Sequence, residues 1–374
     1  MKKKITDSDH DLYKINFNMG RAGKRNIRLA IIGAGGIAQT KYLPAIMRLR
    51  TIWEPVEIVA VSRRSEDQGK KIAKLYGCSW YKNTDEMLEK EKLDAVIVTG
   101  PDKLHTEHAK NCLRRNINVL VEKPIARSLV KAKELCEYAD EKGLVLMTVA
   151  NKRYSLPYVH AKEIVDHGPV TNPSLFCGKF NLKLLQGSLL ESGTIHIFDL
   201  SRYFMGNVKS VHALGVKKYK EYNLDYPVDN LVTTIEFTSG SVGTIYSSST
   251  ALRFKPWERI EIYGNSNWLS IDDQHELIVY DSEQGPIKIF RPVFTNCAYF
   301  YDEEIGGFMG LVENFLEVIR GKDKPRTTGW DGYHAYELVV ATQLSLNRRE
   351  EVELPLDPSE ADSEQTKWLK SCKF

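Results

Sequence analysis

The chain has 374 residues, of which 42% are hydrophobic and 27% charged, and its formal net charge is only +3. This composition is ordinary for a globular protein, and the length suggests two domains. The small net charge and the lack of any run of about 18 apolar residues give no support for a nucleic-acid or membrane partner. The six cysteines include no CxxC pair, so we expect reduced thiols in a cytoplasmic protein without a metal centre.

The first 26 residues are polar and show no regular pattern, which indicates a leader, or an arm that packs on a neighbouring subunit or on a cofactor. From residue 27 onward, short apolar runs alternate with helical segments. The predicted strands cover 28–32, 56–62, 93–99, 118–122 and 145–149. The first predicted helix ends at residue 48, and the others cover 66–76, 104–115 and 129–142. This alternation predicts a doubly wound parallel sheet, an α/β domain of Rossmann type over residues 27–150.

The pattern changes after residue 150, where strands follow one another with little helix between them. A helix over 158–166 precedes candidate strands at 208–216, 231–238, 241–249, 259–263, 268–271, 277–280 and 287–290, and closing helices are predicted over 307–320 and 331–346. Residues 151–374 are therefore expected to form an α+β domain with a large mixed or antiparallel sheet, for substrate binding and oligomerisation. The open face of such a sheet needs a cover, which predicts a homodimer or homotetramer.

A glycine-rich loop, Gly33-Ala-Gly-Gly-Ile-Ala38, follows the first predicted strand and opens a helix. In the pattern G-x-G-x-x-G/A, Gly33 permits the tight turn, Gly35 lets the backbone approach a pyrophosphate, and Ala38 allows close packing of helix and strand. Gly36 and Ile37 complete the loop, whose free N–H groups favour phosphate. We expect a nicotinamide dinucleotide here; the alternative is a purely structural turn.

The end of the second strand bears on the choice of cofactor. An acidic residue there would bind the ribose 2′-hydroxyl of NAD, but this chain has Ser62, Arg63 and Arg64. A guanidinium suits the geometry of a 2′-phosphate, so the sequence favours NADP over NAD. The alternative is that both arginines are solvated surface residues.

The fourth predicted strand ends in Glu122-Lys123-Pro124, at the carboxyl edge of the sheet, where doubly wound folds bind their ligands. A lysine at this edge can hydrogen-bond a substrate hydroxyl or carbonyl, and partial burial would lower its pKa toward a working range. From spacing alone, a surface lysine before a turn is an equally good interpretation.

Five motifs together resemble the glucose-fructose oxidoreductase / inositol dehydrogenase / MocA (Gfo/Idh/MocA) family over residues 27 to 350. They are the glycine loop, Thr99-Gly-Pro-Asp-Lys-Leu-His105, Glu122-Lys-Pro124, Asn151-Lys-Arg-Tyr154 and Gly193-Thr-Ile-His-Ile-Phe-Asp199. The resemblance implies that Lys123 is the central catalytic residue and that the Lys123–Pro124 peptide is cis. It also implies residues that border the cofactor, Thr99, Gly100, Pro101, His105, Glu122, Lys123, Asn151 and Arg153, and substrate-binding roles for Arg153 and Tyr154.

The last motif implies a second catalytic residue, His196, with Asp199 three residues further along the same helix face. The family commonly shows D-x-x-x-H-x-x-D here, but this chain has Ser192 at the first aspartate position, with Glu191 beside it. Ser192 is either a substrate ligand or only a helix N-cap, and Glu191 is a candidate replacement. A buried structural histidine is the alternative for His196. Further along the chain, Trp330, Asp331 and Tyr333 are weaker candidates for closing the cleft.

These features predict reversible hydride transfer between a nicotinamide and a secondary hydroxyl carbon of a sugar, glycoside, sugar derivative or cyclitol. Two alternatives remain open. One is a catalytically silent dinucleotide-binding sensor or regulator, suggested by the missing aspartate. The other is a sugar–sugar oxidoreductase that recycles a tightly bound cofactor.

Overall fold

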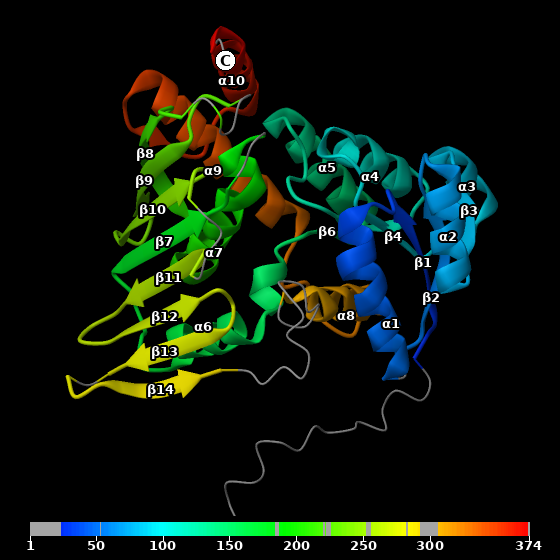
Figure 1. Cartoon of the computed structure of the whole chain (residues 1–374), viewed down its shortest axis with the longest axis horizontal. Coiled ribbons are helices and arrows are strands. Elements are labelled where there is room, and N and C mark those ends of the chain that lie inside the picture. The colour runs from blue at the N-terminus through cyan, green and yellow to red at the C-terminus, as the bar shows by residue number, and fades with distance from the viewer. Residues whose placement is uncertain are drawn as a thin grey trace, which may run out of the picture.

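The computed structural model describes residues 24–52, 54–183, 187–219, 221, 226–251, 256–281, 283–291 and 306–372. Figure 1 shows two sheets side by side, with the N-terminal sheet and its helices on the right and the C-terminal sheet on the left. Most of the predicted leader, residues 1–23, lies outside the described part. At its end, Lys24 pairs with Glu317 (2.7 Å) and Glu54 (3.4 Å), and Arg25 pairs with Asp94 (2.9 Å).

The N-terminal sheet is parallel and has the strand order β3-β2-β1-β4-β5-β6, as expected for a Rossmann domain. Its strands are β1 (Ile27–Ile32), β2 (Val56–Ser62), β3 (Ser79–Tyr81), β4 (Ala95–Val98), β5 (Asn118–Val121) and β6 (Leu146–Thr148). The apolar side chains of the central strands are buried on both faces, which explains their continuous apolar runs. Only the short edge strand β3 and the helix after it, α3 (Thr84–Lys90), escaped the sequence analysis.

Helices cover both faces of this sheet. They are α1 (Leu43–Thr51), preceded by a π-helical turn η3 (Ala38–Tyr42), α2 (Glu66–Tyr76), α3, α4 (His105–Arg114) and α5 (Leu129–Lys142). Two short 3₁₀ turns follow strands β4 and β6, namely η4 (Asp102–Leu104) and η5 (Asn151–Tyr154). The predicted bounds of α2 and α5 are confirmed, because each begins after a serine and ends at a left-handed glycine.

The C-terminal sheet has nine strands in the order β14-β13-β12-β11-β7-β10-β9-β8-β15, all antiparallel except β7 with β10. They are β7 (Leu175–Asn181), β8 (Val208–Val216), β9 (Asn230–Phe237), β10 (Val242–Ser248), β11 (Glu258–Tyr263), β12 (Trp268–Asp272), β13 (Glu276–Tyr280), β14 (Pro286–Phe290) and β15 (Val352–Glu353). The large mixed sheet is confirmed. The sequence analysis missed the central strand β7, in which Gly178 leaves room for Ile197 of a covering helix.

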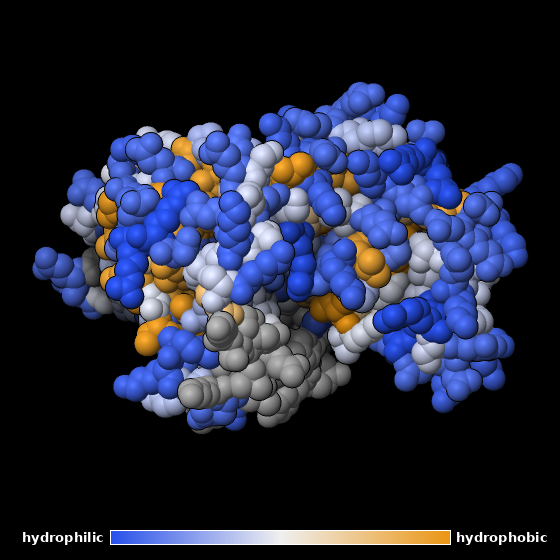
Figure 2. All heavy atoms as spheres, turned by 90° about the horizontal axis from the view of Figure 1, so that it is seen from above, coloured by the Kyte–Doolittle hydropathy of each residue, from blue (hydrophilic) through white to orange (hydrophobic). Residues whose placement is uncertain are grey.

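Helices α6 (Leu156–His167), α7 (Ile195–Met205) and α9 (Gly329–Arg348) pack on one face of this sheet (Figure 1). The opposite face exposes apolar side chains: Leu214, Val232, Tyr246, Ile287 and Ile289. Figure 2 shows hydrophobic patches on its left side, where this sheet lies, within an otherwise mostly hydrophilic surface. The chain closes with α10 (Pro358–Ser371), which contacts α5 and α9.

The domain boundary predicted at residue 150 is crossed by helix α8 (Phe308–Ile319). Although α8 belongs to the C-terminal half of the sequence, it packs on α1, and Phe308 makes an edge-on contact with Tyr42 of the η3 turn at 5.3 Å. Phe308, Leu311 and Phe315 belong to the same buried cluster as β1 and α1. The N-terminal lobe is therefore completed by a segment that follows the C-terminal sheet.

The described helices include none that is long and apolar enough to cross a membrane. Five of the six cysteines are described, and each is a free thiol: Cys78, Cys112, Cys136, Cys177 and Cys372. Cys297 lies outside the described residues. The cytoplasmic location stays a prediction.

Candidate active site

The glycine loop makes a tight turn where β1 and β4 end side by side. Gly33 has a φ of +86°, and a Cβ atom there would lie 2.4 Å from Cα of Gly100. The Thr99 hydroxyl donates to the Gly33 carbonyl (2.9 Å), which ties the loop after β4 to the glycine loop. A Cβ on Gly35 would meet only the Gly33 carbonyl, at 3.6 Å, so this stretch of backbone is open to a ligand.

A cavity of about 620 Å³ lies against this turn, at the carboxyl ends of β1 and β4. Its lining residues are Ile32, Gly33, Gly35, Ser62, Arg63, Arg64, Ser65, Lys82, Thr84, Thr99, Gly100, Pro101, Leu104 and His108. Eight of these are among the residues predicted to bind the cofactor. No carboxylate is among the described lining residues. Ala38 is buried beneath the turn and Gly36 is exposed beside it.

The end of β2 presents two arginines in different settings. Arg63 donates through its terminal nitrogens to the Ala34 carbonyl and to Gln68, so its guanidinium is anchored over the glycine loop. Arg64 is exposed at the rim of the cavity, as is Lys82 after β3. Ser62 is buried, and its hydroxyl lies 3.2 Å from that of Thr84. The available cations at this end of the cavity are therefore Arg64 and Lys82.

His105 links two loops at the edge of the dinucleotide turn. Its ring is buried, with Nδ1 2.8 Å from the Pro124 carbonyl and Nε2 2.9 Å from the Gly100 carbonyl. Both ring nitrogens are thus engaged by main-chain oxygens. The histidine fixes the turn after β4 relative to the turn that carries Lys123.

Lys123 follows β5, and its peptide bond to Pro124 is cis, as expected. Its Nζ donates to the main-chain carbonyls of Glu191 (3.2 Å) and Ser192 (2.8 Å). These carbonyls belong to a π-helical turn, η6 (Leu190–Thr194), which directly precedes α7. Such turns occur often at functional sites because they redirect backbone groups. Burial lowers the pKa of Lys123, although the nearby carboxylates of Glu122 and Glu191 oppose the shift.

The chain has serine where the family aspartate is expected, but this turn still contacts Lys123 through its main chain. The main-chain oxygens of Glu191 and Ser192, and not their side chains, hold the lysine. Burial raises the pKa of the Glu191 carboxyl, while Ser192 lines the same pocket as Lys123. Ser192 is not the helix N-cap, because it lies inside the π-helical turn.

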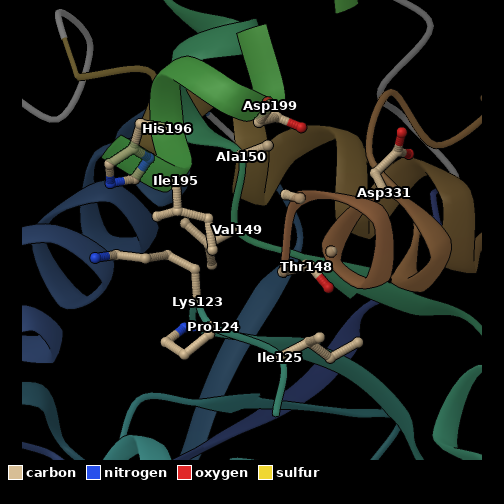
Figure 3. Close-up of a pocket in the computed structure, with 12 residues that line it drawn as sticks. Lys123, Pro124, Ile125, Thr148, Val149, Ala150, Ile195, His196, Asp199 and Asp331 are labelled. Atoms are coloured by element: carbon tan, nitrogen blue, oxygen red, sulfur yellow. The ribbon is translucent and has the colours of Figure 1, made fainter. Parts of the chain in front are cut away.

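His196 lies in the first turn of α7, and no described group makes a hydrogen bond to its ring. Figure 3 shows the His196 ring and the Lys123 side chain on one side of the view, and the carboxylates of Asp199 and Asp331 on the other. Burial, together with the ammonium groups of Lys123 and Lys152, holds the pKa of His196 well below its usual range. This shift favours the neutral imidazole.

Lys123 and His196 line a pocket of about 230 Å³, here called the Lys123 pocket. Its other lining residues are Ile37, Lys41, Glu122, Val149, Asn151, Lys152, Phe180, Leu182, Ser192, Trp257, Gln274, Gly306 and Phe308. Both lobes contribute, and the walls combine aromatic rings with a few polar groups, as small-molecule sites usually do. Gln274 is buried in a left-handed turn (φ +63°), and its Oε1 has no partner among the described residues.

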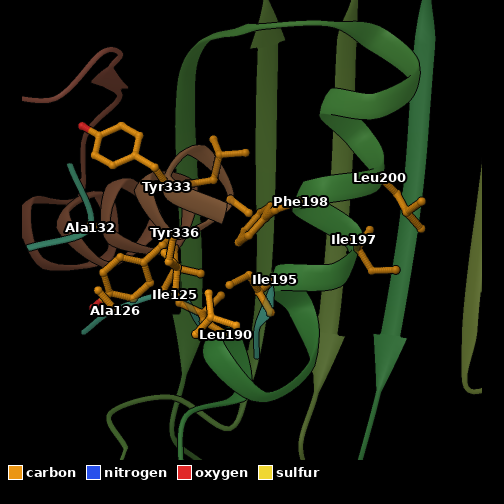
Figure 4. Packing of buried hydrophobic residues seen from close by; sticks show 14 of the residues in the cluster. Ile125, Ala126, Ala132, Leu190, Ile195, Ile197, Phe198, Leu200, Tyr333 and Tyr336 are labelled. Carbon is orange, nitrogen blue, oxygen red and sulfur yellow. The ribbon is translucent and has the colours of Figure 1, made fainter. Parts of the chain in front are cut away.

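A buried hydrophobic cluster holds the turns that carry Lys123 and His196 in place (Figure 4). Ile125 and Ala126 follow the Lys123 turn, Leu190 and Ile195 flank the π-helical turn, and Tyr336 comes from α9. A Cβ on Gly193 would lie 1.9 Å from the Phe180 ring, so the turn also packs closely on β7. The positions of Lys123 and His196 are therefore fixed by packing between α5, α7 and α9.

Arg153 and Asp199 were expected to bind substrate, but the structure pairs them with each other. The Arg153 guanidinium donates to Asp199 through Nε (3.0 Å) and Nη2 (2.6 Å), to Asp331 (3.1 Å) and to the Arg326 carbonyl (3.0 Å). Arg153 is therefore held in a buried bidentate pair and is not among the residues that line the Lys123 pocket. Asp199 nevertheless lines a small pocket together with Lys123, His196 and Asp331, the pocket drawn in Figure 3.

The remaining predicted residues also have structural partners. The Tyr154 hydroxyl donates to Asn314 (2.9 Å), and the Asn151 amide donates to the Gly306 carbonyl (2.6 Å), although Asn151 still lines the Lys123 pocket. Asp331 forms a capping box with Thr328 at the start of α9. Trp330 bonds to Asp140 (2.8 Å) and Tyr333 is buried in the core, so neither closes the cleft.

Comparison with known proteins matches both halves of the chain to family models. Residues 27–150 match the model described as "Oxidoreductase family, NAD-binding Rossmann fold", and residues 183–354 match "Oxidoreductase family, C-terminal alpha/beta domain". The chain belongs to the Gfo/Idh/MocA family of oxidoreductases. The expected family resemblance is thereby confirmed.

Two relatives illustrate the similarity, and both are distant but align over nearly their full length. The chain is 26% identical to myo-inositol 2-dehydrogenase of Thermotoga maritima over 341 residues, 88% of this chain and 98% of that protein. It is 28% identical to D-glucoside 3-dehydrogenase of Escherichia coli, over 88% and 97% of the two chains. The fold is shared with levoglucosan dehydrogenase in complex with NADH, with a TM-score of 0.79, 19% identity, and coverage of 88% and 100%.

As a member of this family, the chain is an NAD(P)-dependent oxidoreductase, and the residues present fit the dinucleotide. Gly33 approaches Gly100 closely in the tight turn, and the open backbone at Gly35 faces the cavity. The main-chain N–H groups at the start of the helix that follows the loop are suited to phosphate. The bound nicotinamide would supply the hydride acceptor or donor. The dinucleotide would be bordered along the cavity by Arg63, Arg64, Thr99, Gly100 and Pro101.

Several residues of this site escaped the sequence analysis. Lys82 and Thr84 line the dinucleotide cavity, and Lys41, Trp257 and Gln274 line the Lys123 pocket. Gln274 and Trp257 come from turns of the C-terminal sheet, far from any motif. Lys152 lies inside the Asn151–Tyr154 motif and lines the Lys123 pocket, but the sequence analysis assigned substrate binding to its neighbours Arg153 and Tyr154.

Proposed function

We propose that this protein transfers a hydride between a nicotinamide dinucleotide and a secondary hydroxyl carbon of a sugar, glycoside, sugar derivative or cyclitol. The observation that supports this most directly is that Lys123 and His196 line one pocket beside the dinucleotide turn. The aromatic walls of that pocket suit the C–H face of a sugar ring. The unpartnered oxygen of Gln274 suits a substrate hydroxyl.

In this proposal, Lys123 contacts the oxygen of the reacting carbon. Its lowered pKa makes the neutral amine more accessible, so Lys123 can take the hydroxyl proton during oxidation and return it during reduction. His196 acts as the neutral acid/base partner, because an imidazole with so low a pKa accepts a proton only transiently. The carbonyls of Glu191 and Ser192 orient the amine until substrate arrives.

Steady-state turnover tests the proposal. Purified full-length protein is assayed with NAD and with NADP against a panel of sugars, glycosides and cyclitols, following the absorbance of the reduced nicotinamide. We expect at least one neutral or charged polyol to be oxidised. Cofactor binding without turnover of any member would contradict the enzyme proposal and favour the silent sensor.

The alternative of a recycled cofactor makes a separate prediction about binding. If one sugar is oxidised and a second reduced on the same dinucleotide, the cofactor should remain bound through extensive dialysis. A denatured sample then releases it for mass spectrometry. Protein that loses its dinucleotide readily is expected for the simple dehydrogenase.

We further propose that NADP is the preferred cofactor, because the described residues that line the cavity near the end of β2 include cations and no carboxylate. Arg63 is anchored, so Arg64 and Lys82 are the proposed 2′-phosphate ligands. An Arg64→Ala variant should lower the ratio of kcat/KM for NADP to that for NAD by about tenfold, the effect of one exposed charged hydrogen bond. Arg114→Ala, an exposed arginine of α4, is the control.

A wild-type preference for NAD, or an unchanged ratio in the Arg64→Ala variant, would overturn this assignment.

We also propose that the protein is a homodimer or homotetramer. The support is the uncovered face of the C-terminal sheet, where the apolar side chains Leu214, Val232, Tyr246, Ile287 and Ile289 are exposed. Apolar area of this kind marks association surfaces. Light scattering that gives the mass of one 42.7 kDa chain would contradict the proposal.

A further inference from the structure

Gln274 lines the Lys123 pocket from the turn between β12 and β13, and the proposed proton transfer does not use it. The residue is only 7% exposed, yet its side-chain Oε1 is buried without a hydrogen-bond partner among the described residues. Buried amide groups in folded proteins nearly always have a partner. Resting on the proposed function, we propose that Gln274 determines specificity: its amide binds a second, non-reacting hydroxyl of the substrate, while Lys123 contacts the hydroxyl that is oxidised.

The turn that carries Gln274 has a backbone conformation that normally selects glycine. The His275 N–H donates to the Asp272 carbonyl (2.9 Å), and the two residues between them, Asp273 and Gln274, have φ values of +50° and +63°. Two left-handed central residues define a type I′ turn, in which the second is most often glycine. The chain therefore places a long amide side chain where the backbone disfavours one, and strained positions of this kind cluster at ligand sites.

Hydrogen bonds fix this turn against the start of β11, so the Gln274 side chain enters the pocket from a rigid support. The Asp273 N–H donates to the Glu258 carbonyl (3.2 Å), and the Asp273 carboxylate accepts from the Glu258 N–H (3.1 Å). Glu258 is itself fully buried and accepts from the Tyr158 hydroxyl (3.0 Å). Because the support is ordered before any ligand arrives, little ordering of the turn opposes binding.

The unpartnered atom is an acceptor, so the group that it binds must be a donor. A sugar or cyclitol hydroxyl can donate to Oε1, and it can also accept from the NH₂ end if the amide is turned by half a rotation. Phe180 and Trp257, whose ring centres lie 5.2 Å apart, give the same pocket an apolar wall. The substrate class that follows is a ring polyol with two recognised hydroxyls, one at Lys123 and one at Gln274.

A competing explanation is that Gln274 only maintains the turn. In that case asparagine, which adopts the left-handed region more readily than most residues, would serve at least as well. The protein would then not distinguish substrates that differ in one non-reacting hydroxyl. If the amide binds the substrate, asparagine keeps the turn but withdraws the amide by one methylene group, so recognition is lost while the fold is retained.

The experiment measures kcat and KM of the full-length protein with its preferred dinucleotide. The substrates are D-glucose, D-galactose and myo-inositol, each with its monodeoxy analogues at the non-reacting positions. In the wild type, one deoxy position should lower kcat/KM at least about tenfold, because its loss leaves the buried amide unpaired. Gln274→Met keeps the length of the side chain without the amide, and should reduce this parent-to-deoxy ratio to below about threefold, mainly through KM of the parent polyol.

Gln284→Met is the matched control, because Gln284 is an exposed glutamine of the next turn, between β13 and β14, and lines neither cavity. The control should keep the wild-type ratio. Gln274→Asn should unfold at the wild-type temperature or above it, yet lose the discrimination as Gln274→Met does. A wild-type ratio in Gln274→Met or in Gln274→Asn, or equal kcat/KM for every parent and deoxy analogue in the wild type, overturns the inference.

If no polyol is turned over, the proposed function fails, but the inference is still tested by binding. Calorimetric titration of the dinucleotide-loaded protein with D-glucose, myo-inositol and their monodeoxy analogues gives the affinities directly. At least about tenfold weaker binding of one deoxy analogue than of its parent, a difference that Gln274→Met removes, supports the hydroxyl subsite. Equal affinities within every pair, or no binding of any of these compounds, overturn it.

Discussion

Replacing Lys123 by methionine should lower kcat about 10²- to 10⁴-fold for every substrate, the usual contribution of general acid–base catalysis. Methionine fills a similar volume but cannot carry the proton or bind the substrate oxygen. Because Lys123 bonds to the carbonyls of Glu191 and Ser192 and not to the glycine loop, the dinucleotide Kd should change less than about twofold. Steady-state kinetics and fluorescence titration of the cofactor measure the two effects.

The pH profile gives the same prediction a second readout. Burial lowers the pKa of Lys123, so its neutral, proton-accepting form increases with pH and becomes abundant below the usual lysine range. In the oxidative direction, kcat/KM should therefore rise with pH and reach a plateau, and in the reductive direction it should fall. The Lys123→Met variant should lose this dependence, whereas the surface variant Lys131→Met retains it.

Normal turnover in Lys123→Met, or a pH profile identical to wild type, would remove Lys123 from the catalytic assignment.

Substituting Gly33 by alanine should abolish dinucleotide binding, with a loss of affinity beyond about 100-fold. The left-handed backbone (φ +86°) costs an alanine about 1–2 kcal/mol. The added Cβ would also lie 2.4 Å from Gly100 backbone, so the loops after β1 and β4 must separate. Those two loops form the floor of the dinucleotide cavity.

Gly77→Ala is the matched control, because Gly77 is also left-handed (φ +67°) but has open space around its Cβ position. Gly77 ends α2 at the surface. The Gly77→Ala substitution should lower the free energy of unfolding only by the cost of the left-handed backbone, about 1–2 kcal/mol, and leave the cofactor affinity unchanged. Thermal unfolding and cofactor titration of both variants separate strain from close contact. Wild-type affinity in Gly33→Ala would show that the turn is not the dinucleotide site.

The elements with a strong local signal were predictable from sequence. The bounds of β2, α2, α5 and β8 are those expected, because apolar runs, serine starts and glycine ends all act within a few residues. Strand β7 was missed because its glycine and polar residues weaken the apolar pattern, and its place in the centre of the sheet depends on distant partners. Helix α10 is absent from the predicted elements because it buries only Ala361 and Gln365, and its sequence therefore lacks an apolar stripe.

The sequence motifs did indicate which side chains meet in one pocket at Lys123 and His196. The site was not predictable where a side chain had two possible partners. Arg153 and Asp199 have the residue types of substrate ligands, but burial makes mutual pairing the more favourable outcome. Gln274 enters the pocket from a turn between β12 and β13 that no local pattern connects to catalysis.

The crossing of helix α8 into the N-terminal lobe limits how this protein can be recombined. An exchange of the dinucleotide-binding half with a relative, cut at residue 150, would leave Tyr42 and the apolar face of α1 without Phe308, Leu311 and Phe315. A working chimera must therefore exchange two separate segments, one that precedes the strands β7–β14 in the sequence and one, helix α8, that follows them. The N-terminal lobe is continuous in space, but two separate segments of the sequence form it.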